Sequence, residues 1–174
     1  MSFSYFKSFT PLQNADSTEI EQVNYFLKQH EKICVSLIQS LSDSKYSVYL
    51  VKDTDILAVI AISTGGNILH CIPNPELIIE AEQSFAKIIS KQKLFCINGE
   101  EKGSLLLLEW IKKHTGKNPV HVNNYLLMDK SLNNFIADTP DYTVKKCSEE
   151  NIQSLLPLEL AYQKEEVFFN DRLP

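Results

Sequence analysis

The first third of the chain carries a helical pattern of hydrophobic positions. From Ile20 to Leu41, apolar residues recur every three or four positions, which is the spacing of one face of an α-helix. Asp16 stands in front of this stretch as a helix N-cap, and Glu19 follows three residues later, as in a capping box. The pattern therefore predicts an amphipathic helix that begins after Asp16 and is either continuous or divided in two near His30.

A group of short strands is predicted to follow. Apolar and polar residues alternate over 46–50, while 56–62 and 68–72 are nearly continuous apolar runs. The segments between them, Asp53-Thr54-Asp55 and Gly65-Gly66-Asn67, consist of turn-forming residues and are too short for a crossover. These strands are therefore expected to form an antiparallel meander, in which the run 56–62 is covered on both faces.

The next elements alternate between helix and strand. Pro75 is placed to open a helix, a short apolar strand is expected at 94–97, a second helix at 100–114 and a strand at 120–128. Strands that are separated by helices pair in parallel through crossovers. Together with a short aromatic-rich strand at 2–10, this order predicts an α/β fold with a mixed sheet flanked by helices.

A polar segment rich in turn-forming residues, 129–140, separates these elements from a further strand and helix. The strand is predicted around Tyr142 and Val144, and the helix begins at about Glu149 and carries many apolar residues. We therefore expect a first domain, a linker, and the first strand and helix of a second domain, which are residues 1–130, 131–140 and 141–174.

The charge of the chain disfavours nucleic acid as a partner. Lys and Arg number 17 against 22 Asp and Glu, which gives a net charge of −5, and the sequence contains no cluster of Lys or Arg. Nucleic-acid phosphates are bound by basic faces. The N-terminal sequence MSFSYFKSF lacks the apolar core of a signal peptide, and no apolar run approaches the ~20 residues of a membrane span. We expect a cytoplasmic protein without a membrane segment.

The cysteines are not spaced as metal ligands. None forms a C-x-x-C pair, and no histidine stands at ligand spacing from one of them. Cys71 follows His70 on a predicted strand, so the two side chains are expected on opposite faces and do not form a nucleophile–base pair. Each cysteine lies in an apolar run, so we expect all of them to be reduced core residues. They are Cys34, Cys71, Cys96 and Cys147.

The order of elements and one motif resemble the GNAT family of acyl-CoA N-acetyltransferases. Over residues 1–130 the element order is similar to that of a GNAT domain. The segment from Tyr142 to Val167 resembles the first strand and helix of a further GNAT domain, through the run Pro-Leu-x-x-Ala-Tyr-x-x-Glu-Glu-Val. In a bacterial subgroup, such a segment follows a GNAT-like N-terminal domain. The resemblance implies transfer of an acetyl group from acetyl-CoA to the amine of a small molecule or a protein.

The cofactor loop of that family is missing from the predicted first domain. GNAT enzymes hold the pyrophosphate of acetyl-CoA with a glycine-containing loop between the fourth strand and the next helix. Here the junction is His-Cys-Ile-Pro-Asn-Pro-Glu-Leu, residues 70–77, with no glycine, Lys or Arg. Pro73 and Pro75 each lack an N–H donor, and Glu76 repels a phosphate. We expect a degenerate first domain that does not bind acetyl-CoA tightly, in a chain that ends before the second domain's own loop.

The resemblance also indicates candidate site residues. Asn98 follows the strand 94–97, where many GNAT domains have an asparagine near the pantetheine arm of the cofactor; alternatively it is a turn residue in Asn-Gly. Tyr162, Glu165 and Glu166 belong to the helix that borders the acceptor amine in related enzymes. Glu165 would steer an ammonium or act through water as a base, or these acids form a solvated face of the helix.

Two functions remain open from the sequence. The first is part of an acyl-CoA-dependent N-acetyltransferase in which this segment is not catalytic alone. The second is a non-catalytic GNAT-like module that binds a partner domain or a small ligand. In either case, the apolar residues of the C-terminal segment would fold back on residues 1–130, pair with a second copy or stay disordered. We favour a homodimer through residues 141–170, because a large exposed apolar patch is unusual in a monomer.

Overall fold

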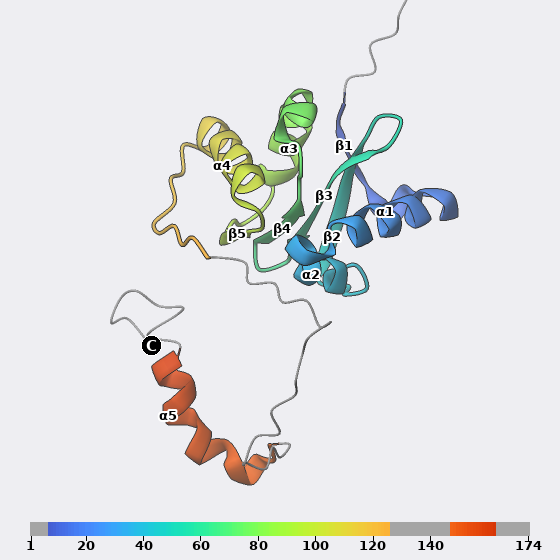
Figure 1. Ribbon diagram of the computed structural model, residues 1–174. Coiled ribbons are helices and arrows are strands. Elements are labelled where there is room, and N and C mark those ends of the chain that lie inside the picture. Colours follow the sequence, from blue (N-terminus) through green and yellow to red (C-terminus); the bar gives the residue numbers. More distant parts are fainter. Residues whose placement is uncertain (1–6, 126–146, 163–174) are drawn as a thin grey trace, which may run out of the picture. The chain divides into compact units, whose positions relative to one another are not determined.

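A mixed sheet forms the centre of the first of two structural units (Figure 1). The computed structural model describes residues 7–125 and 147–162, which belong to the units Met1–Lys130 and Ser131–Pro174. The strands of the sheet are β1 (Phe9–Pro11), β2 (Tyr46–Lys52), β3 (Ile56–Ser63), β4 (Asn67–Cys71) and β5 (Cys96–Asn98). Their order is β1-β2-β3-β4-β5; the first four are antiparallel to one another, and β5 runs parallel to β4.

Helices cover both faces of this sheet. They are α1 (Ser17–Gln29), α2 (Glu31–Ser40), α3 (Glu82–Ile89) and α4 (Glu101–Thr115). α1 and α2 lie on one face, and α3 and α4 lie on the other (Figure 1). Alternate residues therefore enter two separate cores: Ile68 and Ile72 pack on the α3–α4 side, while Leu69 and Cys71 pack on the α1–α2 side. The prediction of an α/β fold with a mixed sheet flanked by helices is confirmed.

Local sequence determines where α1 begins and where it is separated from α2. The carboxylate of Asp16 accepts a hydrogen bond from the N–H of Glu19 at 2.8 Å, which confirms the predicted N-cap. His30 has φ −113° and ψ 18°, and it ends α1 directly before α2 begins. Of the two alternatives drawn from the sequence, the divided helix is therefore the one that forms.

The predicted meander of strands is confirmed, with changes at its ends. β2, β3 and β4 pair in sequence as antiparallel neighbours, and β5 joins β4 in parallel after a helical crossover. The strand expected at 2–10 forms over Phe9–Pro11, and residues 1–6 lie outside the described part of the chain. The helix expected from Pro75 begins as a 3₁₀ helix, Pro75–Ala81, and becomes α-helical at Glu82.

The strand predicted at 120–128 does not form over its described part. Residues 120–125 belong to no strand, and Val120 is 98% exposed. Alternation of apolar residues specifies a strand only where a neighbouring strand pairs with its backbone and a core covers one face. Among the described residues, neither condition is met at 120–125. Residues 126–128 lie outside the described ranges.

The described part of the second unit is helical. A 3₁₀ turn, Glu149–Asn151, leads into α5 (Ile152–Tyr162), which confirms the helix predicted from about Glu149. The N–H of Ser148 donates to Oδ1 of Asn151 at 3.0 Å and caps this start. The predicted linker 131–140 and the strand around Tyr142 and Val144 fall outside the described residues.

Two glycines with positive φ offer a matched test of the close packing beside β4. A Cβ on Gly66 (φ 90°) would collide with the carbonyl of Lys93, lying 2.8 Å from its carbon, whereas a Cβ on Gly116 (φ 70°) would meet no described atom within 4 Å. An alanine is strained by the positive φ at both positions. The difference between the two losses of unfolding free energy therefore measures the cost of the collision at Gly66. We expect Gly66→Ala to lower the free energy of unfolding by about 2–4 kcal/mol and Gly116→Ala by about 1 kcal/mol. Urea unfolding followed by circular dichroism measures both, and equal losses would contradict the prediction.

Candidate functional site

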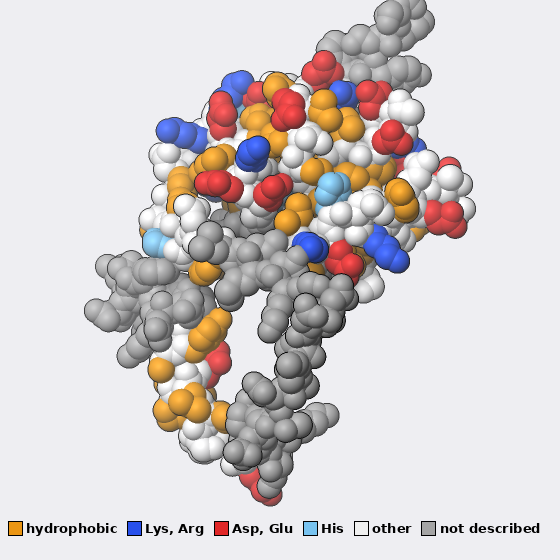
Figure 2. Space-filling model, viewed as in Figure 1, with side chains coloured by type: hydrophobic (Ala, Val, Ile, Leu, Met, Phe, Trp, Pro, Cys, Tyr) orange, Lys and Arg blue, Asp and Glu red, His pale blue; other side chains and the backbone are white. Residues whose placement is uncertain are grey.

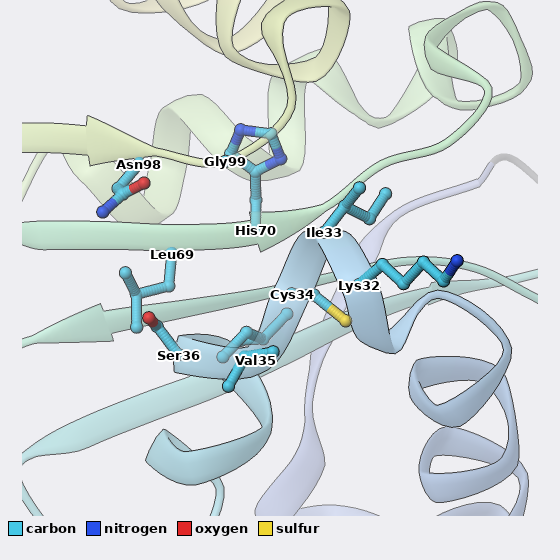
Figure 3. A pocket seen from close by; sticks show the side chains of 10 residues that line it. Lys32, Ile33, Cys34, Val35, Ser36, Leu69, His70, Asn98 and Gly99 are labelled. Atoms are coloured by element: carbon cyan, nitrogen blue, oxygen red, sulfur yellow. The ribbon is translucent and has the colours of Figure 1, made fainter. Parts of the chain in front are cut away.

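An open groove of about 290 Å³ lies between α2 and the ends of β4 and β5 (Figure 3). Its walls include the apolar side chains of Ile33 and Val35 from α2 and Leu69 from β4. Ser36 and Asn98 add a hydroxyl and a carboxamide to the same walls. Lys32 of α2 is a charged member of the same lining. The groove therefore combines an apolar surface, neutral hydrogen-bonding groups and one cationic side chain.

The groove lies at the place where the pairing between β4 and β5 ends. β5 pairs with β4 only from Cys96 to Asn98, and its last partner is Leu69. β4 continues to Cys71 without β5 beside it. Asn98 stands at this end, where it is exposed and lines the groove, so the structure places the predicted site residue beside the groove.

His70 occupies the opposite face of β4. Its ring points away from α2 (Figure 3), and it is 1% exposed. Nε2 of His70 lies 2.8 Å from Oγ of Ser104 in α4, while Nδ1 has no hydrogen-bond partner among the described residues. Gly99 and Gly103 enclose the ring, and a Cβ added at Gly103 would lie 2.7 Å from Cε1 of the imidazole. The ring thus fills a space that these two glycines leave open.

Burial controls the charge of His70. Removal from water disfavours the imidazolium and lowers the pKa of His70 to about 4, so the ring is neutral at pH 7. A neutral imidazole hydrogen-bonded to a serine hydroxyl is the contact of a base with a nucleophile. Here the ring is enclosed and Nδ1 lacks an orienting partner within the described residues, so the contact serves packing of α4 on β4.

Sequence reasoning found one part of this arrangement and missed the other. The expectation that His70 and Cys71 point to opposite faces is confirmed, because their side chains enter different cores. The contact with Ser104 was not predicted. Ser104 is 34 residues away in the chain, and no local motif signals which residue of α4 will face His70.

The junction after β4 does not fit a pyrophosphate. Pro73 and Pro75 remove two N–H donors, and Asn74 makes no side-chain cap to the following helix within the described residues. The N–H of Leu77 is already bonded to the carbonyl of Asn74 at 3.1 Å, in the tight spacing of a 3₁₀ turn. The junction therefore presents neither a row of free N–H groups nor the start of an α-helix to an anion.

The other predicted site residues lie elsewhere or outside the described chain. Tyr162 is the last described residue of α5, in the second unit, and its side chain is exposed. Glu165 and Glu166 lie outside the described ranges. Asn98 belongs to the first unit and Tyr162 to the second.

The cysteines divide into two groups. Cys34 and Cys71 are buried, as predicted, whereas Cys96 and Cys147 are exposed, so the prediction of four core cysteines is wrong for two of them. Cys96 lies on the terminal strand of the sheet, which is covered less than its neighbours, and Cys147 lies just before the cap of a helix. An apolar neighbourhood in sequence does not by itself bury a residue at the edge of a fold.

Three further observations describe the surface and its chemistry. Acidic and basic side chains are mixed over the first unit on the face shown in Figure 2. In the described ranges, no cluster of three or more His, Cys, Asp and Glu side chains could hold a metal ion. None of the described helices has both the length and the apolar character needed to cross a membrane.

The fold and the groove define the class of this protein as an α/β domain with a five-stranded mixed sheet. No protein-family model, no curated protein and no solved structure matches the chain.

The buried imidazole predicts an acid-sensitive fold. The pKa of His70 lies at about 4 in the folded chain, below its ordinary value of 6.5, so the unfolded chain binds more protons between these two values. The free energy of unfolding therefore contains the full contribution of the neutral, buried His70 above about pH 6.5. This contribution is lost as the pH falls from 6.5 towards 4, and the total loss is about 3 kcal/mol. Unfolding free energies at several pH values should fall more steeply in the natural chain than in His70→Gln, and parallel curves would contradict the assignment.

Proposed function

We propose that residues 1–130 are a GNAT-like domain that has lost its cofactor phosphate site, within an acyl-CoA-dependent N-acetyltransferase that acetylates an amine on a small molecule or a protein. The observation that carries this proposal is the direction of the strands. Four antiparallel strands are followed, after α3, by a parallel fifth strand that ends opposite Leu69, two residues before the end of β4. The groove opens beside this end of β5, with Asn98 on its wall.

The groove supports binding of the uncharged part of such a cofactor. A pantetheine arm is a flexible chain of amides and methylene groups, and Ile33, Leu69 and Asn98 offer both kinds of contact. The junction from Pro73 to Glu76 provides no anion site for the phosphate end. The proposal therefore assigns to the groove contacts with the pantetheine arm alone.

A second function is favoured by the same junction. A domain that keeps a groove but lacks the phosphate site is suited to binding a partner or a small ligand without catalysis. Both functions assign a non-catalytic role to this domain. They differ in whether the remainder of the protein catalyses acetyl transfer. The acceptor-side candidates Tyr162, Glu165 and Glu166 matter only under the first function.

The missing phosphate site predicts how this chain binds fragments of the cofactor. Acetyl-CoA carries phosphates that pantetheine lacks, and the described junction after β4 offers them no binding site. We therefore expect acetyl-CoA to bind no more tightly than pantetheine and more weakly than about 1 μM. Calorimetry measures both affinities, and amide chemical shifts at Leu69 and Asn98 locate any weak binding.

A matched variant makes this test specific to the groove. Asn98→Ala should weaken pantetheine binding, whereas Asn123→Ala, also an exposed asparagine in the described chain, should leave it unchanged. A micromolar affinity for acetyl-CoA, or an affinity at least tenfold above that of pantetheine, would contradict the proposal.

The exposed apolar surface of α5 supports a homodimer. Hydrophobic side chains gather on this helix (Figure 2), including Ile152, Leu156, Leu158 and Leu160. Apolar residues occur around most of its circumference, and a helix of that kind is normally buried. A two-fold contact would let one such surface cover its copy. We propose self-association through residues 141–170.

Light scattering on the complete chain and on a version that ends at Lys130 tests this association. The complete chain should have twice the mass expected for one copy, and the shortened version should be a monomer. Leu158→Glu in the complete chain should also give a monomer, because it places a charge on the apolar surface. A monomer in both lengths, or a dimer in both, would show that this segment does not drive association.

A further inference from the structure

One Asn-Gly pair occurs in the sequence, Asn98-Gly99, and it stands where β5 ends. Both residues line the groove (Figure 3). Within the described chain, β5 is paired on one side alone, with β4, and it is only 3 residues long. The pair therefore lies where regular backbone pairing stops, on the last strand of the sheet.

The groups of this pair that can react with each other are open to solvent. Asn98 and Gly99 are both exposed, and the carboxamide of Asn98 makes no hydrogen bond to a described residue. Gly99 has no side chain beside its backbone nitrogen. Attack of that nitrogen on Cγ of Asn98 closes a small ring, the succinimide, and reactions within one molecule gain greatly from proximity.

Packing on the other face of β4 explains why residue 99 is a glycine. A Cβ at this position would lie 2.5 Å from Cε1 of His70, whose ring is 1% exposed and hydrogen-bonded to Ser104. Any side chain at 99 would displace this ring or α4. The fold therefore requires, directly after Asn98, the residue that hinders ring closure least.

We propose that Asn98 is a site of spontaneous deamidation, with water as the co-reactant. The backbone nitrogen of Gly99 loses its proton to hydroxide and forms a bond to Cγ of Asn98. The C–N bond of the carboxamide breaks, and its nitrogen leaves as ammonia with a proton taken from water. Water then opens the succinimide at either carbonyl and gives aspartate or isoaspartate. The net reaction consumes one water and releases one ammonia, without oxidation or reduction.

The reaction changes the groove and the turn beside it. A neutral carboxamide of the lining becomes a carboxylate, so the groove gains a negative charge and is less suited to anionic ligands. In the isoaspartate product, the backbone runs through the former side chain, which lengthens the connection to Glu100, the N-cap of α4. These changes need no cofactor and do not depend on the proposed function.

Peptide mass spectrometry on the complete, folded chain tests this proposal. The chain is kept at mildly alkaline pH until a sample unfolded in urea is largely deamidated at Asn98, and both samples are then digested under acidic conditions. Asn14 is the matched control, because it is also exposed and without a hydrogen bond to a described residue, but is followed by Ala15. In the folded chain, the fraction that carries the mass of OH in place of NH₂ should be clearly larger at 98 than at 14.

Two variants assign the signal to the Asn-Gly pair. Asn98→Gln should abolish it, because a glutamine side chain closes a larger ring more slowly. Asn98→Asp supplies the reference peptide for the aspartate product, and a further product of the same mass with a different retention time is the isoaspartate. Circular dichroism checks that each variant is folded. An unmodified Asn98 in the folded chain, or equal deamidated fractions at 98 and 14, would overturn the proposal.

Discussion

Burial of β3 and β4 on both faces is the constraint on which the rest of the structure depends. Val59 and Ala61 of β3 enter the core with α1 and α2, while Ala58, Ile60 and Ile62 enter the core with α3 and α4. Complete burial of one such aliphatic side chain contributes about 1.5–3 kcal/mol. Since a shift of the register by one residue would exchange the two sets, the two helical layers together fix how the strands align.

The same two layers produce the candidate site. α2 packs on β4 from one face and forms a wall of the groove, while α4 packs on the other face and closes over His70. Gly99 and Gly103 allow α4 to come close enough for Ser104 to reach the imidazole. An apolar groove and a buried polar contact thus lie on opposite sides of one strand, and each depends on a different helix.

The proposed function follows from what surrounds the end of β4. Beside the end of β5 lies a groove lined by apolar and polar side chains and by Lys32, and the proline-containing junction after β4 gives a 3₁₀ helix without an anion site. Binding of an uncharged ligand segment needs only the groove, while binding of a phosphorylated cofactor also needs an anion site, which this junction does not provide.

The sequence by itself determined the elements whose signals are local. The Asp16 cap, the break at His30, the turns between β2, β3 and β4, and the helical start near Ser148 all depend on residues within a few positions of one another. Tertiary structure decided the rest. The strand expected at 120–128 has no pairing partner over 120–125 within the described chain, and Cys96 is exposed because β5 is the last strand of the sheet. The contact of His70 with Ser104 joins distant residues, so it exists only once α4 has packed on β4, and hydrophobic periodicity carries no information about which side chains then meet.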